Sequence, residues 1–134
     1  MTGIDSPNIP GLSRFTFATR RVEKPWGWEL IWAESEHYVG KLLFVEAGNA
    51  LSLQFHNVKD ETVYVHEGKV QWEIGEPGAT VLETEVVGPG TSFRITPGTI
   101  HRMTAVEDTL MLEVSTPHLG DVVRLEDRYG RAGT

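Results

Sequence analysis

The chain has 134 residues, of which 40% are hydrophobic and 23% are charged, and it contains no cysteine. This composition is typical of one soluble globular domain and excludes disorder, a coiled coil and a membrane span as descriptions of the whole chain. Without cysteine, a disulfide framework, a thiolate zinc site and a thiol nucleophile are also excluded. The net charge is −7, and no basic stripe of the kind found in nucleic-acid-binding proteins is present.

The N-terminal part of the chain predicts an arm without regular structure. Residues 1–20 contain Gly3, Pro7, Pro10 and Gly11, which interrupt any periodic pattern. This part has no apolar core of secretory length, so no signal peptide is predicted and the cytoplasm is the expected compartment. A single domain is expected over residues 21–131, with neither a membrane nor a nucleic acid as partner.

The rest of the chain predicts a fold made of strands. Nine short stretches are rich in β-branched and aromatic residues, several alternate with period two, and Gly- and Pro-containing turns separate them. They lie at residues 29–32, 41–45, 51–55, 62–65, 70–74, 80–82, 92–95, 101–104 and 109–114. Nine strands and no convincing helix predict an all-β sandwich or barrel, and the charged stretch 119–131 is compatible with one helical turn.

The residues best suited to chemistry lie on one expected strand and on the turns around it. On a strand through residues 51–55, side chains two positions apart face the same way, so Gln54 and His56 are expected to point together. Glu61 arrives from the start of the next strand, and His101 follows a turn further along the chain. Two imidazoles, a carboxylate and an amide oxygen predict a site for a divalent metal.

These residues also carry a family resemblance. The spacing Gly48-x5-Gln54-x-His56-x4-Glu61-x6-Gly68 resembles the first motif of the cupins, and residues 90–101 resemble the second. Cupins are all-β jelly rolls, or double-stranded β-helices, that hold a metal on ligands from these two motifs. Carried over position by position, the resemblance implies Gln54, His56, Glu61 and His101 as metal ligands, with Gln54 where most cupins have histidine.

Within the cupins, the chain resembles the type II mannose-6-phosphate isomerase domain. The resemblance covers residues 21–131 and rests on Lys-Pro-Trp-Gly at 24–27, on residues 51–56 and 97–102, and on the segment 123–131 that ends in Glu-Asp-Arg-Tyr-Gly-Arg. That domain is often fused behind a sugar-nucleotide pyrophosphorylase, a half that is not among these 134 residues. The resemblance implies a sugar-phosphate aldose–ketose isomerase with zinc as the first-choice ion, although iron, manganese or nickel would fit the same ligands.

Such an isomerase also needs cationic side chains for the phosphate and a base for the proton. The predicted substrate-binding residues are Lys41, Arg102 and Arg124, and the candidate bases are Glu46, Glu113 and His37. For Arg102 and Arg124, a purely structural role is the alternative to substrate binding. A regular strand would turn Arg102 away from a metal held by His101, and Arg124 is one of several C-terminal charges that can pair among themselves.

Two other classes of function remain open at the level of sequence. Two histidines and one carboxylate also suit a non-haem iron dioxygenase or a small lyase on the same barrel. A non-catalytic module that binds a sugar or another metabolite is the third reading, since a fold does not determine a function. A homodimer is expected in each case, because exposed sandwich edges favour pairing and cupins often form dimers; the N-terminal arm is then available to cross to the partner.

Overall fold

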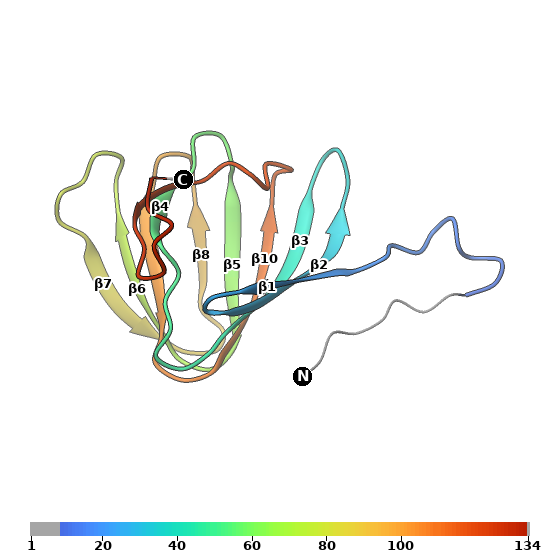
Figure 1. Cartoon of the computed structure of the whole chain (residues 1–134), viewed down its shortest axis with the longest axis horizontal. Helices are drawn as coiled ribbons and strands as arrows, with labels where there is room; N and C mark the ends of the chain where they lie inside the picture. The colour runs from blue at the N-terminus through green and yellow to red at the C-terminus, as the bar shows by residue number, and fades with distance from the viewer. Residues whose placement is uncertain (1–8, 134) are drawn as a thin grey trace.

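The computed structural model describes residues 9–133, which form two antiparallel β-sheets packed face to face (Figure 1). The six-stranded sheet has the order β1-β2-β3-β10-β5-β8 and the five-stranded sheet the order β11-β4-β9-β6-β7. The strands are β1 Arg20–Lys24, β2 Gly27–Glu34, β3 Val39–Val45, β4 Leu53–Phe55, β5 Glu61–Glu67, β6 Val70–Gly75, β7 Glu83–Val87, β8 Ser92–Ile95, β9 Ile100–Ala105, β10 Thr109–Ser115 and β11 Val123–Glu126. The all-β jelly-roll sandwich predicted from the sequence is confirmed.

Eight of the nine predicted strands are present, seven of them with shifted ends, and the strand predicted at residues 80–82 is wrong. Those residues belong to a wide hairpin loop, where Val81 is 84% exposed, and β7 begins only at Glu83. The sequence reading also missed β1 and β11, and residues 119–131 form β11 and turns in place of a helical turn. β1, β7 and β11 all lie at sheet edges, where side chains are often charged. The apolar alternation in their sequences is therefore weak.

Inner side chains change from charged to apolar along several strands, which divides the interior into two ends. On β3 the inner residues are Lys41 and then Leu43, and on β5 they are Glu61 and then Val63. β9 and β10 show the same division: His101 against Met103, and Glu113 against Met111. The apolar halves form the core around the fully buried Trp72, and the charged halves surround a cavity at the other end.

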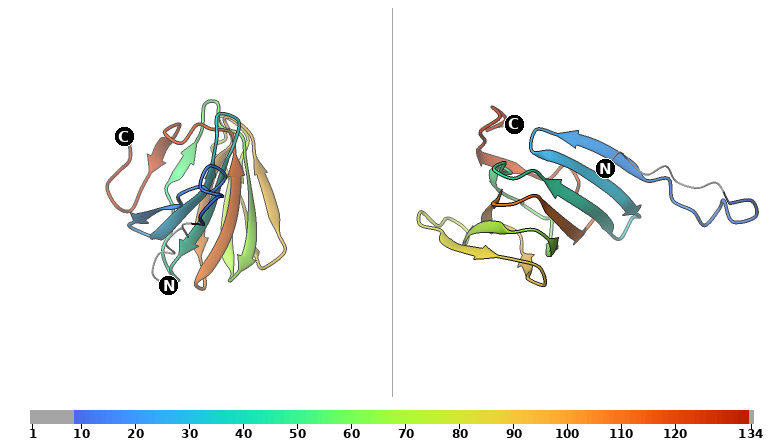
Figure 2. Two further views of the ribbon diagram at one scale, coloured as in Figure 1. Left: turned by 90° about the vertical axis from the view of Figure 1, so that its right-hand side faces the viewer. Right: turned by 90° about the horizontal axis from the view of Figure 1, so that it is seen from below.

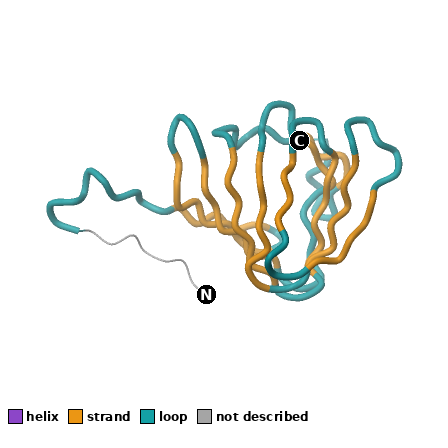
Figure 3. Tube along the Cα trace, turned by 180° about the vertical axis from the view of Figure 1, so that it is seen from behind, coloured by secondary structure: helices purple, strands orange, loops and turns teal. Residues whose placement is uncertain are grey.

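Residues 9–19 form turns and a loop that lead away from the sandwich (Figures 1 and 3, and the right-hand view of Figure 2). The first strand begins at Arg20, and residues 1–8 of the predicted arm lie outside the described residues. Between residues 9 and 133 there is no helix with the length and apolarity needed to cross a membrane.

A glycine holds the turn that joins β5 to β6, and we expect Gly68→Ala to destabilise the fold by about 3 kcal/mol or more. Gly68 has φ +103°, and a Cβ there would lie 2.4 Å from the backbone oxygen of Asp108. Gly48→Ala is the matched control, because φ is +86° and nothing lies within 4 Å of an added Cβ. Backbone strain alone is therefore expected there, about 1–2 kcal/mol. Urea unfolding of both variants separates the two costs, and equal losses would contradict the steric explanation.

Candidate metal centre

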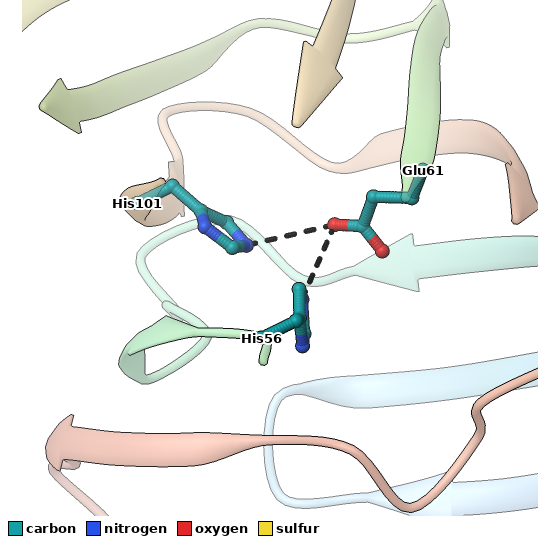
Figure 4. A group of neighbouring side chains, drawn as sticks. All are labelled: His56, Glu61 and His101. Atoms are coloured by element: carbon teal, nitrogen blue, oxygen red, sulfur yellow. Dashed lines mark ion pairs between the residues drawn. The ribbon is translucent and has the colours of Figure 1, made fainter. Parts of the chain in front are cut away.

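Three side chains from separate elements meet inside the charged end of the sandwich. His56 lies directly after β4, Glu61 opens β5, and His101 is the second residue of β9. Glu61 Oε1 lies 3.6 Å from His56 Nε2 and 3.5 Å from His101 Nε2 (Figure 4). All three residues are at most 5% exposed, and their ligand atoms lie within 4.8 Å of one another. This arrangement can hold a metal ion.

Both imidazoles are oriented from behind by backbone carbonyls. His56 Nδ1 lies 2.5 Å from the oxygen of Asp121, and His101 Nδ1 lies 3.0 Å from the oxygen of Thr99. A carbonyl accepts, so each Nδ1 donates a proton to it, and each Nε2 is the ring nitrogen that faces the centre. Within residues 9–133 neither buried Nε2 has a hydrogen-bond partner. Two buried imidazole nitrogens beside a carboxylate fit a divalent ion.

Gln54 lines the same cavity as His56 and Glu61. It is the cross-strand partner of His101 between β4 and β9, and partners in an antiparallel ladder project to the same face. Its Oε1 accepts a hydrogen bond of 2.7 Å from Ser52 Oγ. The alternation expected for residues 51–56 is observed, since Ser52, Gln54 and His56 all line the cavity.

The loop before Glu61 carries a buried lysine that the sequence reading missed. Lys59 Nζ lies 2.7 Å from Glu61 Oε2 and 3.2 Å from Glu113 Oε2, and all three residues are buried. The sequence could have predicted its direction, because on an extended chain Lys59 faces the same way as Glu61, two positions later. Lys59 therefore links the carboxylate of the metal site to a second buried carboxylate.

The pKa values of Glu61 and Glu113 are shifted in opposite directions. Burial raises the pKa of Glu61, but the imidazoles of His101 and His56 and the ammonium of Lys59 outweigh it and hold the pKa well below its usual value. Burial, followed by the charge of Glu61, raises the pKa of Glu113 above its usual value, although Lys59 and Lys41 oppose the rise. Glu61 is thus suited to binding a cation, and Glu113 to exchanging a proton.

The loop beneath His56 is held in place by Asp121. Its carboxylate accepts hydrogen bonds from three successive backbone N–H groups, those of Asn57, Val58 and Lys59, at 3.0, 2.7 and 2.8 Å. Burial raises the pKa of Asp121, but these three donors outweigh it and lower the pKa to about 2. Asp121 therefore remains ionised and fixes the segment that carries both His56 and Lys59.

The cavity has a volume of about 110 Å³ and is rich in charge. Lys41 and Arg124, two of the predicted substrate-binding residues, line it, and so do Lys24 and Arg131, which the sequence reading did not select for binding. Lys41 Nζ lies 3.1 Å from Glu29 Oε2, and Lys24 Nζ lies 3.7 Å from Glu29 Oε1. Arg124 is the cross-strand partner of Gln54, which explains why it faces inward.

Three other predicted residues are not brought to the cavity. Arg102 points to the outer face, because it follows the inward-facing His101 on β9, and it makes a bidentate pair with Glu73 at 3.0 and 2.9 Å. Glu46 is exposed in the loop after β3, and the side chain of His37 is 78% exposed in the loop before it. Of the three candidate bases, the structure brings only Glu113 to the cavity.

The C-terminal segment is held by Asp127, and we expect Asp127→Asn to lower stability at pH 7 by about 1–2 kcal/mol. Arg131 donates to both oxygens of this carboxylate, at 3.0 and 2.9 Å, and thereby lowers its pKa. A lowered pKa stabilises the fold only above the usual value near 3.8, and this contribution is lost as the pH falls below it.

The difference between Asp127→Asn and the parent protein should therefore shrink from pH 6 towards pH 3 in urea unfolding. The exposed Glu85 on β7 provides the control, since Glu85→Gln should change stability by less than about 0.5 kcal/mol. A difference for Asp127→Asn that stays constant with pH would show that the charge of this carboxylate contributes nothing.

Residues 41–116, more than half of the chain, match the Cupin domain family. The chain belongs to the cupin family. This segment contains the two histidines and the glutamate described above, together with Gln54, Lys59 and Glu113. The chain matches no curated protein.

Solved structures support the fold of this cupin. An oxalate decarboxylase from Lactobacillus farciminis, in complex with formate, has a TM-score of 0.66 and 17% identity over 80% of this chain. KdgF from a Halomonas species has a TM-score of 0.62 and 22% identity, covering 75% of this chain and 88% of its own. The oxalate decarboxylase of Bacillus subtilis, with Mn(II) centres, has a TM-score of 0.66 and 20% identity over 78% of this chain. This cupin spans 33% and 29% of the two decarboxylase chains.

Proposed function

We propose that this cupin is a metal-dependent sugar-phosphate isomerase of the type II mannose-6-phosphate isomerase kind, which its sequence resembles. The observation that supports the proposal is the charge of the cavity. Five cationic side chains line it in a chain with only 12 lysines and arginines and a net charge of −7. With a divalent ion bound at the histidines, this set of charges would leave the cavity positive, which suits an anionic ligand.

The charges of the cavity favour a doubly charged anion. The lining cations are Lys24, Lys41, Lys59, Arg124 and Arg131, and the lining carboxylates are Glu29, Glu61, Glu113 and Asp121. Asp127, which pairs with Arg131, is a fifth carboxylate, so the two sets balance. A divalent ion at the histidines then leaves about two positive charges, which matches the dianion of a phosphomonoester.

The chain's own residues divide the work of an isomerase among them. His56, Glu61 and His101, with Gln54 beside them, would hold the ion, for which zinc is our first choice. When bound, a divalent cation supplies Lewis-acid polarisation of a substrate carbonyl. Lys41, Arg124 and Lys24 bind the phosphate through charge-assisted hydrogen bonds.

Glu113 moves the proton between C1 and C2 of the sugar. It is buried, it lines the cavity, and its pKa is raised by burial and by the charge of Glu61, which suits a group that accepts and returns a proton. Lys59 holds one of its oxygens. Because sugar phosphates do not cross membranes unaided, the proposal implies a cytoplasmic protein with a small-molecule partner.

The test is turnover of mannose 6-phosphate to fructose 6-phosphate by zinc-loaded protein, followed by NMR in deuterated water. Solvent deuterium at C1 of the fructose 6-phosphate, or at C2 of the recovered mannose 6-phosphate, would show proton transfer through an exchanging base and support the proposal. Oxygen consumption with bound iron would favour the dioxygenase. Retained sugar-phosphate affinity in metal-free protein, without turnover of any candidate, would favour the binding module.

If the proposal holds, Glu113→Gln should lower kcat by about 10²- to 10⁴-fold, with KM and metal content nearly unchanged. The amide keeps the shape of the side chain but cannot accept the proton. Glu46→Gln is the control, since Glu46 is exposed and does not line the cavity. Steady-state kinetics with metal analysis decides the point, and a Glu113→Gln enzyme with normal kcat would remove Glu113 from the mechanism.

A further inference from the structure

The two histidines of the metal centre are held by different parts of the chain. His101 Nδ1 donates to the oxygen of Thr99, two residues earlier, whereas His56 Nδ1 donates to the oxygen of Asp121, 65 residues later. Figure 4 shows the two rings reaching Glu61 from different sides. Local sequence therefore orients one imidazole, and the C-terminal segment, residues 119–133, orients the other.

The β-ladders constrain His56 only weakly. The strand before it, β4, has three residues, and a single register pair, Gln54 with His101, joins it to β9. Its other neighbour is β11 of the C-terminal segment, which pairs with it through three residues and a register shift. After β4 the chain is not in a strand again until Glu61. The position of His56 relative to the other two metal side chains therefore depends on contacts outside the ladders.

Asp121 makes four of those contacts. Its carboxylate accepts hydrogen bonds from the backbone N–H groups of residues 57–59, and its carbonyl oxygen accepts the bond from His56 Nδ1. Successive N–H groups that converge on one carboxylate form a concave nest for an anion. One residue thus holds both the imidazole of His56 and the chain that follows it.

Two other contacts fix the ends of the same loop. The oxygen of His56 accepts a hydrogen bond of 2.7 Å from the N–H of Gly98, and Asp60 exchanges bonds of 3.0 and 3.1 Å with Thr116. Neither contact involves residues 57–59 or the ring of His56. Without the carboxylate of Asp121, the loop would therefore stay attached at both ends, while its centre and the imidazole would gain freedom.

We propose that Asp121 is a positioning residue for the metal, and that through His56 it makes the affinity for a divalent ion depend on the C-terminal segment. The inference rests on the metal centre that the proposed function needs, and it does not require isomerase activity. A side chain that is already held in place loses little freedom when the ion binds, so the ion binds more tightly. Loss of such an outer partner ordinarily costs about 10- to 100-fold in metal affinity.

The experiment is a zinc titration of the full chain against a competing chromophoric chelator, at a temperature where the proteins are folded. Asp121→Asn keeps one acceptor oxygen and should weaken zinc binding by about tenfold; Asp121→Ala keeps none in its side chain and should weaken it by about 100-fold. Asp108→Asn is the matched control, with the zinc affinity of the parent. Asp108 Oδ1 also accepts a distant backbone N–H, that of Ala47 at 2.8 Å, but Asp108 is not among the described residues that line the cavity.

NMR of the histidine side-chain nitrogens in zinc-loaded protein gives a second readout, which a merely structural role would not produce. In the parent, each Nδ1–H is bonded to a carbonyl. In Asp121→Asn, the Nδ1–H signal of His56 should shift or be lost to solvent exchange, and that of His101 should stay unchanged. Urea unfolding of chelator-treated protein measures the cost in stability separately.

An Asp121→Ala variant with the zinc affinity of the parent would overturn the proposal, and so would a parent chain that binds no zinc. Equal weakening by Asp108→Asn, or equal changes in both histidine signals, would assign Asp121 a general structural role and overturn it as well. Zinc binding that depends on Asp121 in a protein without isomerase activity would support the inference and contradict only the proposed function. Circular dichroism shows which variants retain the fold, and Asp121→Asn, the milder change, decides the point if Asp121→Ala unfolds.

Discussion

Purified without chelator, the protein is expected to carry about one equivalent of divalent metal, and His101→Ala is expected to reduce this below about 0.1 equivalent. His101 Nε2 faces Glu61 Oε1 in a buried site, and alanine offers no ligand atom in its place. Elemental analysis gives the stoichiometry. Thermal unfolding with added zinc adds a second readout, because an ion that binds only the folded state raises Tm.

The matched control for this metal experiment is His66→Ala on β5. His66 has a side chain that is 54% exposed and lies outside the cavity, so its removal should leave both the metal content and the zinc-dependent rise in Tm unchanged. Equal metal content in the parent protein and in His101→Ala would refute the site. An ion other than zinc would leave the ligands as assigned and would change only the choice of metal.

Replacement of Lys59 by methionine is expected to destabilise the metal-free protein by about 3–5 kcal/mol at pH 7. Methionine fills a similar volume, but Glu61 and Glu113 both lose the ammonium that lies 2.7 and 3.2 Å from their oxygens. Two carboxylates would then share a buried site without this cation, and burial already raises the pKa of Glu113. Urea unfolding of chelator-treated protein measures the cost.

The control for the lysine substitution is Lys69→Met. Lys69 is exposed in the turn before β6, so the expected change is within about 0.5 kcal/mol. Metal should reduce the cost of Lys59→Met, because a bound cation replaces part of the lost positive charge beside Glu61. Equal stabilities of Lys59→Met and Lys69→Met without metal would show that the buried link contributes nothing.

Most strand positions, and the side chains that meet at the candidate metal centre, could be predicted from local sequence for one physical reason. A strand alternates its side chains between two faces, so residues 51–56 already indicated that Gln54 and His56 point together. The same alternation indicated that Arg102 faces away from His101, as its pair with Glu73 shows. The edge strand β7 escaped this reasoning, because an exposed strand with two glutamates has little apolar pattern.

By itself, therefore, the sequence determined the all-β class, most of the strands and the motif spacing that places the chain among the cupins. Only the tertiary structure decided which charges share the cavity. Lys24, Lys41, Glu113 and Arg124 lie far apart along the chain. They meet through the successive pairings of β1 with β2, β2 with β3 and β3 with β10, and through the pairing of β11 with β4. Strand register over such separations depends on the packing of the whole sandwich, and no local pattern encodes it. The choice of Glu113 over Glu46 and His37 follows from that register alone.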